Sequence, residues 1–346
     1  MSGFWARQRW WLGRVIALPF QLLLFAIIAF FLVRLIPGDP VLAVTGNQVS
    51  PEEYLAVKHR LGLDGSPITQ LFNYLGRLVQ GDLGESLISG RSVFDDIRTR
   101  LPATVELAAM SLLVSSILVF AVSVLIMFRP RNIISRAAVA FSRTAGSIPE
   151  FAVAIVFIFI FYAKLNWLPA PLGRLTPGSP TPVVVTHFPF LDALLTGDPA
   201  IIGSMLAHLV MPVAALVISI SAVLLRLLNS QVEVEMQKPA TRFRISTGAG
   251  IGTVILSVYR RALPGTVTMA GALFGNLIGS AVVLEGLFSF GGMGQYLVKA
   301  VQSADLTAMQ GFLIVAAALS LVIFLLVDIV NMMLDPRRRP GVGAKP

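Results

Sequence analysis

The chain has 346 residues and a net charge of +9, yet only 13% of its residues are charged and 55% are hydrophobic. Soluble globular chains carry about a quarter charged residues, so this composition excludes an ordinary soluble domain and indicates a polytopic membrane protein. The sequence contains no cysteine, which excludes disulfides, thiolate chemistry and cysteine-based metal sites. The histidines are scattered and show no metal-ligand spacing; they are His59, His187 and His208.

Six apolar stretches are long enough to cross a hydrocarbon core, for which about 20 residues suffice. They predict an all-α protein with six transmembrane helices near 14–36, 104–128, 137–163, 205–228, 264–288 and 308–333. The first stretch is interpreted as a retained signal anchor, because its apolar core is too long for a cleaved signal peptide.

Lys and Arg residues are concentrated before the first span, after the second and fourth spans, and in the tail "DPRRRP". An excess of these residues marks cytoplasmic loops, so both termini are expected in the cytoplasm. The same rule explains the net charge without nucleic-acid binding. The first outer loop is also basic, but long loops cross the membrane largely regardless of charge.

The expected organisation follows from these spans. Residues 1–36 form an N-terminal cytoplasmic end and the first span, and 37–103 an extracytoplasmic loop with short helices. Residues 104–333 form a five-helix core that contains a cytoplasmic loop at 229–263, and 334–346 form a basic tail.

The first outer loop contains a helix signature in "SPEEYLAVKHRLGLD". Ser50 is placed as N-cap, Pro51 at the first helical position and Glu53 at the third position of a capping box. Gly62 can end this helix, which is expected to lie over the outer mouth. A second outer loop, 164–204, is rich in Pro, Gly and Thr.

The stretch "RISTGAGIGTVILSVYRRALPG", residues 244–265, first suggests a phosphate-binding loop. A dinucleotide fingerprint needs G-x-G-x-x-G after a strand, whereas Thr253 stands at the third glycine position and no strand is expected before it. A P-loop needs Gly-Lys, a pair that does not occur in the chain.

The residues after these glycines instead repeat apolar side chains at the spacing of one helix face, from Ile251 to Ala262. Pro264 and Gly265 are expected to break this helix before the fifth span. The loop is therefore predicted as two short helices joined by a glycine hinge beneath the membrane. Periodicity leaves open whether it is an interfacial connector or a docking element for a cytoplasmic partner.

Polar residues inside spans are costly in lipid and tend to face protein or water. In the fifth span, Asn276, Ser280 and Glu285 lie roughly on one face and are candidates for lining a path or for bonding to neighbouring helices. Glu150 lies beside Pro149 in the third span, where it can face a water-filled path or pair with an arginine such as Arg143.

Glycines in the fifth span recur every four residues, at Gly271, Gly275 and Gly279. This small-xxx-small spacing lets two helices approach closely. The fifth span is therefore expected at a subunit interface or facing a pore.

An ordered set of motifs runs through nearly the whole chain. "RLIPGDPV" closes the first span, "GSIPEF" falls in the third and "HLVMPVAAL" opens the fourth; "GSAVVLEGLFSFGGMGQYLVKAV" and "LVDIVNMMLDPRRR" end the fifth and sixth. In this order the chain resembles the inner-membrane permease subunits of dipeptide/oligopeptide ABC importers, specifically the B-type partner of the permease pair.

The resemblance implies a type I ABC importer permease fold with a cytoplasmic coupling helix between the fourth and fifth spans. The residues that match the coupling segment are Arg242, Phe243, Ser246, Gly248, Gly250 and Ile251. By position, Gly250 corresponds to the family's motif glycine and Gly248 to the alanine position before it.

The resemblance also implies partners: a C-type sister permease, two ATP-binding subunits, an extracytoplasmic peptide-binding protein and membrane lipid, in a bacterial inner membrane. ATP and magnesium would be bound by the ATP-binding subunits, and no cofactor or metal by this chain. The chain is expected to be a transport subunit and not an enzyme, with no catalytic residues. Import of a nickel chelate or glutathione by the same assembly, or a self-sufficient channel or secondary transporter, remain alternatives.

Overall fold

The structure, a computed structural model, describes residues 2–35, 39–45, 49–60 and 63–334. Throughout these residues the regular structure is helical, apart from one isolated bridge between Glu85 and Ser92, so the all-α prediction is confirmed. Five helices in the described part are long and apolar enough to cross a membrane. They are α1 (Ser2–Arg34), α5 (Val93–Phe128), α9 (Pro199–Gln237), α11 (Ile251–Leu287) and α13 (Leu306–Leu334).

Helix α9 forms the core of the bundle. It packs against α5 and α11 along its length, and its side chains are far more buried than those of the other long helices. Leu216, Leu224 and Leu228 are almost fully buried at these contacts. The outer helices instead expose large apolar side chains, such as Phe20 of α1 and Ile117 of α5. Such surfaces are stable against lipid, which supports the membrane assignment.

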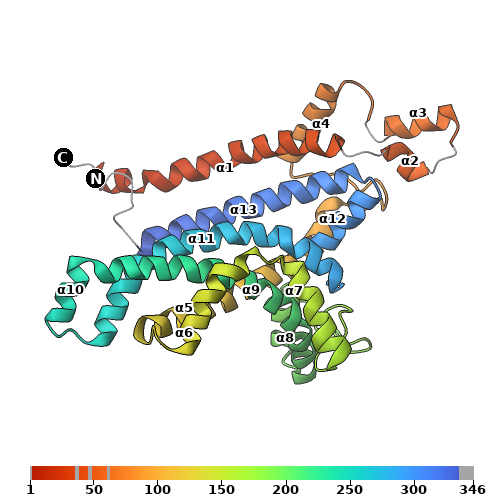
Figure 1. Cartoon of the computed structure of the whole chain (residues 1–346). Helices are drawn as coiled ribbons and strands as arrows, with labels where there is room; N and C mark the ends of the chain where they lie inside the picture. Colours follow the sequence, from red (N-terminus) through yellow and green to blue (C-terminus); the bar gives the residue numbers. More distant parts are fainter. Residues whose placement is uncertain (1, 36–38, 46–48, 61–62, 335–346) are drawn as a thin grey trace.

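Helix α1 lies beside α13 and contacts the rest of the bundle mainly through it. Figure 1 shows that the start of α1 and the end of α13 lie at the end of the molecule that also carries α10 (Pro239–Ser246). The opposite end carries α12 (Met293–Gln302). We refer to these as the α10 end and the α12 end.

Three short helices follow α1, namely α2 (Pro40–Thr45), α3 (Pro51–Arg60) and α4 (Pro67–Val79). The predicted cap of α3 is confirmed, because the Glu53 amide donates to the Ser50 hydroxyl at 3.2 Å. Helix α3 packs against α2, beyond the end of the bundle in Figure 1. Its predicted end at Gly62 lies outside the described residues.

The third predicted span, 137–163, is not one continuous helix. The chain forms α6 (Ile133–Thr144), a 3-10 turn η1 (Ala145–Ser147), α7 (Glu150–Phe157) and a π-helical turn η2 (Ile158–Lys164). The break falls at Ile148, which precedes Pro149 and is held extended with ψ of 122°. A residue before proline is disfavoured in the helical region, so the helix cannot run through this point.

The predicted break at Pro264 and Gly265 is wrong. Helix α11 runs without interruption through both residues and joins the expected short helix to the fifth span. Pro264 is buried within a helix that packs on α9 and α13, so tertiary packing stabilises a helix that has lost one internal hydrogen bond.

The second outer loop is less irregular than its composition suggests. It contains α8 (Pro189–Thr196), and α9 already begins at Pro199, capped by the Asp198 carboxylate at 2.8 Å from the Ala200 amide. The Glu106 carboxylate of α5 accepts hydrogen bonds from the Phe190 and Leu191 amides at the start of α8. This loop is thereby fixed to the bundle.

Candidate functional site

Helix α10 ends in a tight turn that requires one glycine. The Gly248 amide donates to the Ile245 carbonyl and the Ala249 amide to the Arg244 carbonyl, the pattern of a Schellman motif. Gly248 has φ of +77°, a conformation that other residues rarely adopt. Gly250 has φ of −58° and is the N-cap of α11, and a Cβ added there would meet nothing within 4 Å. The glycines therefore serve a helix–turn–helix connection and form no phosphate loop.

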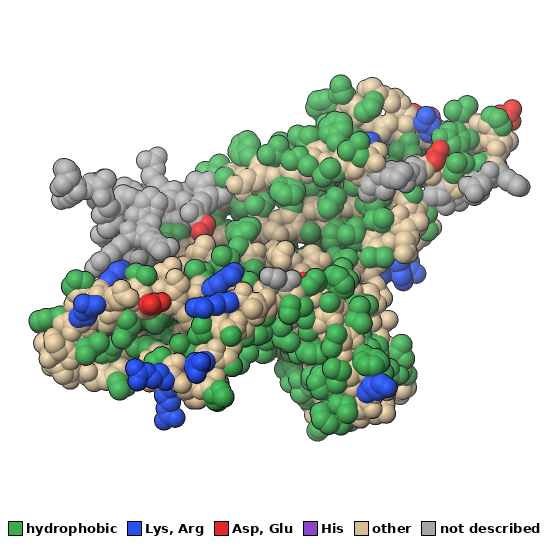
Figure 2. Space-filling view, viewed as in Figure 1, with side chains coloured by type: hydrophobic (Ala, Val, Ile, Leu, Met, Phe, Trp, Pro, Cys, Tyr) green, Lys and Arg blue, Asp and Glu red, His purple; other side chains and the backbone are tan. Residues whose placement is uncertain are grey.

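This connection presents an exposed apolar surface with a basic rim. Phe243 and Ile251 are each 68% exposed, and Ser246, which lies between them in the sequence, is also exposed. Arg242 is exposed on the same turn of chain. Figure 2 shows Lys and Arg side chains gathered over the α10 end. We call residues 239–252 the α10 segment.

The α10 segment is held to the bundle by one buried carboxylate. Glu235, near the end of α9, is 5% exposed and accepts from Lys238 Nζ at 2.5 Å and from Arg261 Nε at 2.7 Å. Arg261 also donates to the Thr241 hydroxyl of α10 at 2.7 Å and to Ser257 at 3.0 Å. The Thr241 hydroxyl in turn donates to the Glu235 carbonyl. This network of hydrogen bonds joins α9, α10 and α11.

One side of α11 has no partner within the described chain. Its exposed residues recur at helix spacing and, apart from Val283, are small or polar: Ala272, Asn276, Gly279, Val283 and Gly286. Ser280 is half-buried beside this row. Two of the regularly spaced glycines, Gly271 and Gly275, instead face α13, where Gly271 contacts Val327. On one side of α11 the small residues thus allow close packing against α13, and on the other side they leave an exposed face.

Glu150 lies at the first position of α7, because the chain is interrupted at Pro149 and a new helix starts there. Its side chain is half-buried and makes no ion pair among the described residues. Pairing with Arg143 is therefore not seen.

Glu285 is separated from the other polar residues of α11 by its burial. It is 1% exposed; the Thr104 hydroxyl of α5 donates to it at 2.5 Å and the Gly294 amide of α12 at 2.6 Å. A side chain at Gly292 or Gly294 would overlap the carboxylate, and one at Gly294 would also meet the backbone of Val282. We call this arrangement the Glu285 cradle. It closes α12 onto α5 and α11 and leaves this carboxylate no contact with an open path.

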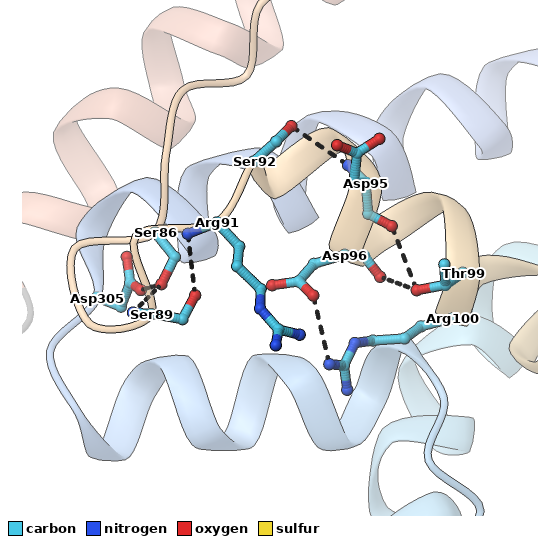
Figure 3. Close-up of polar contacts among 9 residues, drawn as sticks. All are labelled: Ser86, Ser89, Arg91, Ser92, Asp95, Asp96, Thr99, Arg100 and Asp305. Atoms are coloured by element: carbon cyan, nitrogen blue, oxygen red, sulfur yellow. Dashed lines mark hydrogen bonds and ion pairs between the residues drawn. The ribbon is translucent and has the colours of Figure 1, made fainter.

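A second buried carboxylate fixes the α12 end. The Ser86 hydroxyl donates to the Asp305 carboxylate at 2.5 Å (Figure 3). Asp305 also accepts from the Ala308 amide at the start of α13. Nearby on α5, Arg100 lies 3.5 Å from the Asp96 carboxylate and 5.1 Å over the ring of Tyr296. The loop before α5 is thus anchored to the turn between α12 and α13.

Among the described residues, no three side chains of the metal-ligating types come together.

Several of these contacts escape sequence reasoning. Thr104 and Glu285 are 181 residues apart, and no local pattern relates them. Glu235 is different, since an acidic residue three positions before Lys238, at the end of an apolar span, is a signal that could have been used.

Comparison with known proteins identifies the family. Residues 117–340 match the model of the binding-protein-dependent transport system inner membrane component, and residues 8–108 match the N-terminal region of that component.

Individual relatives align over almost the entire chain. The probable D,D-dipeptide transport system permease protein of Escherichia coli is 31% identical over 343 residues, which cover 98% of this chain and 99% of the relative. The di/tripeptide transport system permease protein of Pseudomonas aeruginosa is 30% identical, covering 90% and 93%. The dipeptide transport system permease protein of Alkalihalophilus pseudofirmus is 29% identical, with the same coverage.

Proposed function

Because the chain belongs to the family of inner-membrane components of binding-protein-dependent transport systems, we propose that it is the permease subunit that couples peptide uptake to ATP hydrolysis on partner chains. The α10 segment is the observation that carries this proposal. Phe243 and Ile251 are exposed there beside basic side chains, which supports a contact with another protein.

The docking residues proposed for the ATP-binding subunits are those matched from the sequence: Arg242, Phe243, Ser246, Gly248, Gly250 and Ile251. Phe243 and Ile251 supply the apolar contact and Arg242 the rim. Gly248 sets the turn, and Gly250 leaves room for an approaching backbone. Since the Glu235 network joins α10 to α9 and α11, movement of the docked subunit would rotate these helices as a unit. ATP and magnesium belong to the partner chains in this scheme.

The translocation path is proposed along the open face of α11, between this chain and a sister permease of the same family. Asn276 is exposed on this face and Ser280 borders it. Glu150 is half-buried at the start of α7 and forms no ion pair within the described part of the chain, and it is proposed as a charged group of the path. Glu285 is not included, because both of its oxygens are bonded within the Glu285 cradle.

The cargo proposed is a dipeptide or short oligopeptide delivered by an extracytoplasmic binding protein. The support is that relatives aligned over 90% or more of this chain are described as dipeptide or di/tripeptide permeases. Family membership argues against a channel that works alone. The α10 end, where basic side chains gather, is proposed to face the cytoplasm together with both termini.

Co-purification tests the assembly. The tagged chain, extracted in a mild detergent, is expected to bring with it a second permease and one or two ATP-binding subunits, identified by mass spectrometry. Recovery of this chain alone as a stable homo-oligomer would contradict the proposal. Uptake of a labelled dipeptide by vesicles containing the whole assembly and its binding protein tests the cargo, with a nickel chelate and glutathione as competitors.

A further inference from the structure

A polar cavity of about 300 Å³ lies where α1 leaves the membrane. It is formed by the end of α1, one face of α4 and the start of α13. It therefore stands apart from both the α10 segment and the open face of α11. Its lining residues include Phe30, Arg34, Gln70, Tyr74, Arg77 and Gln310.

Two guanidinium groups line this cavity, and no acidic residue lines it among the described residues. Arg34 is oriented by bonds to the Gln70 side chain at 2.6 Å and the Phe30 carbonyl at 3.3 Å, and it stacks 3.5 Å over the Phe30 ring. Arg77 lies against Gly84. Neither arginine forms an ion pair within the described chain. Cations placed together without a counter-charge favour an anion between them.

Tyr74 adds an unused donor. It is 7% exposed, lines the cavity, and its hydroxyl has no hydrogen-bond partner in the described structure. Burial raises the pKa of Tyr74 to about 12, so the hydroxyl remains a neutral donor at physiological pH. A buried hydroxyl without a partner is costly, and an oxyanion in the cavity would supply the missing acceptor.

The position of the cavity indicates the source of the anion. Arg34 is the last residue of the apolar span of α1, so the cavity lies at the edge of the hydrocarbon layer. Helix α4 exposes Ile68, Phe72 and Val79 while its opposite face packs on α1. A short helix with an exposed apolar stripe lies in the membrane interface, at the depth of the lipid phosphates.

We propose that this cavity binds the phosphate of an anionic phospholipid headgroup, held by Arg34, Arg77 and the Tyr74 hydroxyl. Its acyl chains would remain in the bilayer beside α1. The site is independent of the proposed cargo and would fasten α1 and α4 to α13.

The test uses the full chain, delipidated in a neutral detergent and titrated with phosphatidylglycerol in native mass spectrometry. Parallel titrations use phosphatidylcholine, and a further series adds inorganic phosphate as competitor. One tightly bound phosphatidylglycerol is expected. Equal binding of both lipids would overturn the proposal, as would the absence of a bound lipid. Full displacement of the lipid by millimolar phosphate would show a site for free anions and overturn the assignment to a headgroup.

Three variants locate the site. Arg34→Gln with Arg77→Gln is expected to weaken phosphatidylglycerol binding by at least about tenfold, the effect of losing a charge-assisted hydrogen bond. Arg98→Gln removes an exposed arginine of α5 and serves as the control with unchanged binding. Tyr74→Phe keeps the ring in place, so it should leave the lipid-free melting temperature unchanged or raised and reduce the rise produced by phosphatidylglycerol. An undiminished rise in this variant, or equal loss of binding in Arg98→Gln, would overturn the proposal.

Discussion

At the α10 end a buried carboxylate is held by cations, whereas at the α12 end buried carboxylates are held by neutral donors. Glu235 is paired with Lys238 and Arg261, whose side chains are 50% and 34% exposed. Glu285 and Asp305 accept from hydroxyl and amide groups that are buried around them. Hydrogen bonds from buried neutral donors are strong in the low-dielectric interior and are shielded from solvent. Ion pairs with partly exposed cations can instead be weakened by salt or by a docking partner.

The two ends therefore have different structural roles. The Glu285 cradle and the Ser86–Asp305 contact bind loops and helices into one body. The Glu235 network instead connects this body to an exposed apolar segment. We expect substitutions at the α12 end to reduce folding, and substitutions at the α10 end to reduce coupling with a smaller loss of stability.

The largest effect is expected for Gly294→Ala. The new Cβ would meet the backbone of Val282, which cannot move aside as a flexible side chain could, so the free energy of unfolding should fall by about 3 kcal/mol or more. Gly286→Ala, at an exposed position of α11 with nothing within 4 Å, is the matched control. The yield of monodisperse protein and its melting temperature measure the difference. Similar stability of the two variants would contradict the close packing of α12 on α11 at Gly294.

The next effect concerns Arg261→Ala, which leaves Glu235 with one cation and Thr241 without its donor. Since Arg261 is partly exposed, the loss of stability is expected to be about 1–3 kcal/mol, below that for a fully buried pair. Peptide-stimulated ATP hydrolysis in the reconstituted assembly should fall more than the melting temperature suggests. Arg260→Ala, the exposed neighbour, should change neither quantity. Equal ATP hydrolysis and equal melting temperatures for the two variants would contradict the role of the Glu235 network in connecting α10 to the long helices.

A smaller effect is expected from pH at Asp192, which also has neutral donors. Burial acts to raise the pKa of this carboxyl, but bonds from the Thr186 hydroxyl and amide and the His187 amide outweigh it and hold the pKa below 3.8. A lowered folded-state pKa gives stability that is present above the unfolded value and lost as the pH falls through the folded one. The melting temperature of the wild type should therefore exceed that of Asp192→Ala at neutral pH, and the gap should narrow only below about pH 4. A gap that closes between pH 5 and 7 would contradict this arrangement.

The smallest effect on stability is expected for Glu150→Gln, within about 0.5 kcal/mol, because the carboxylate forms no ion pair with any other residue that the structure describes. Uptake of cationic peptides should nevertheless fall more than uptake of anionic peptides. Equal changes for both classes would remove Glu150 from the proposed path.

The sequence predicts local features of this fold better than contacts between distant parts of the chain. The cap at Ser50 and the buried face of α11 at Val254 and Val258 follow from spacing and local hydrogen bonding, and both are confirmed. Pro264 was expected to end a helix, yet its burial against other helices overrides the local preference. At Pro149 the local effect of proline decides the structure. It interrupts the helix within the stretch 137–163, which hydropathy alone predicts as one span.

The site shows the same division. Spacing places Ile251 on the same apolar face as Val254 and Val258, yet the Ile251 side chain is 68% exposed at the start of α11. The cradle around Glu285 could not be anticipated, since its donors come from helices far apart in sequence. Glu285 alone looks like a path residue, and only its partners reveal a structural role.

The central claim is that the α10 segment docks on an ATP-binding subunit. Because the chain lacks cysteine, Phe243→Cys and Ile251→Cys each introduce a single thiol at an exposed position of this segment. In membranes containing the whole assembly, a short thiol-to-amine cross-linker should join both variants to the ATP-binding subunit. The control Val185→Cys, in the 165–188 loop, should give no such product. Absence of cross-links from positions 243 and 251, or equal cross-linking from position 185, would contradict the account.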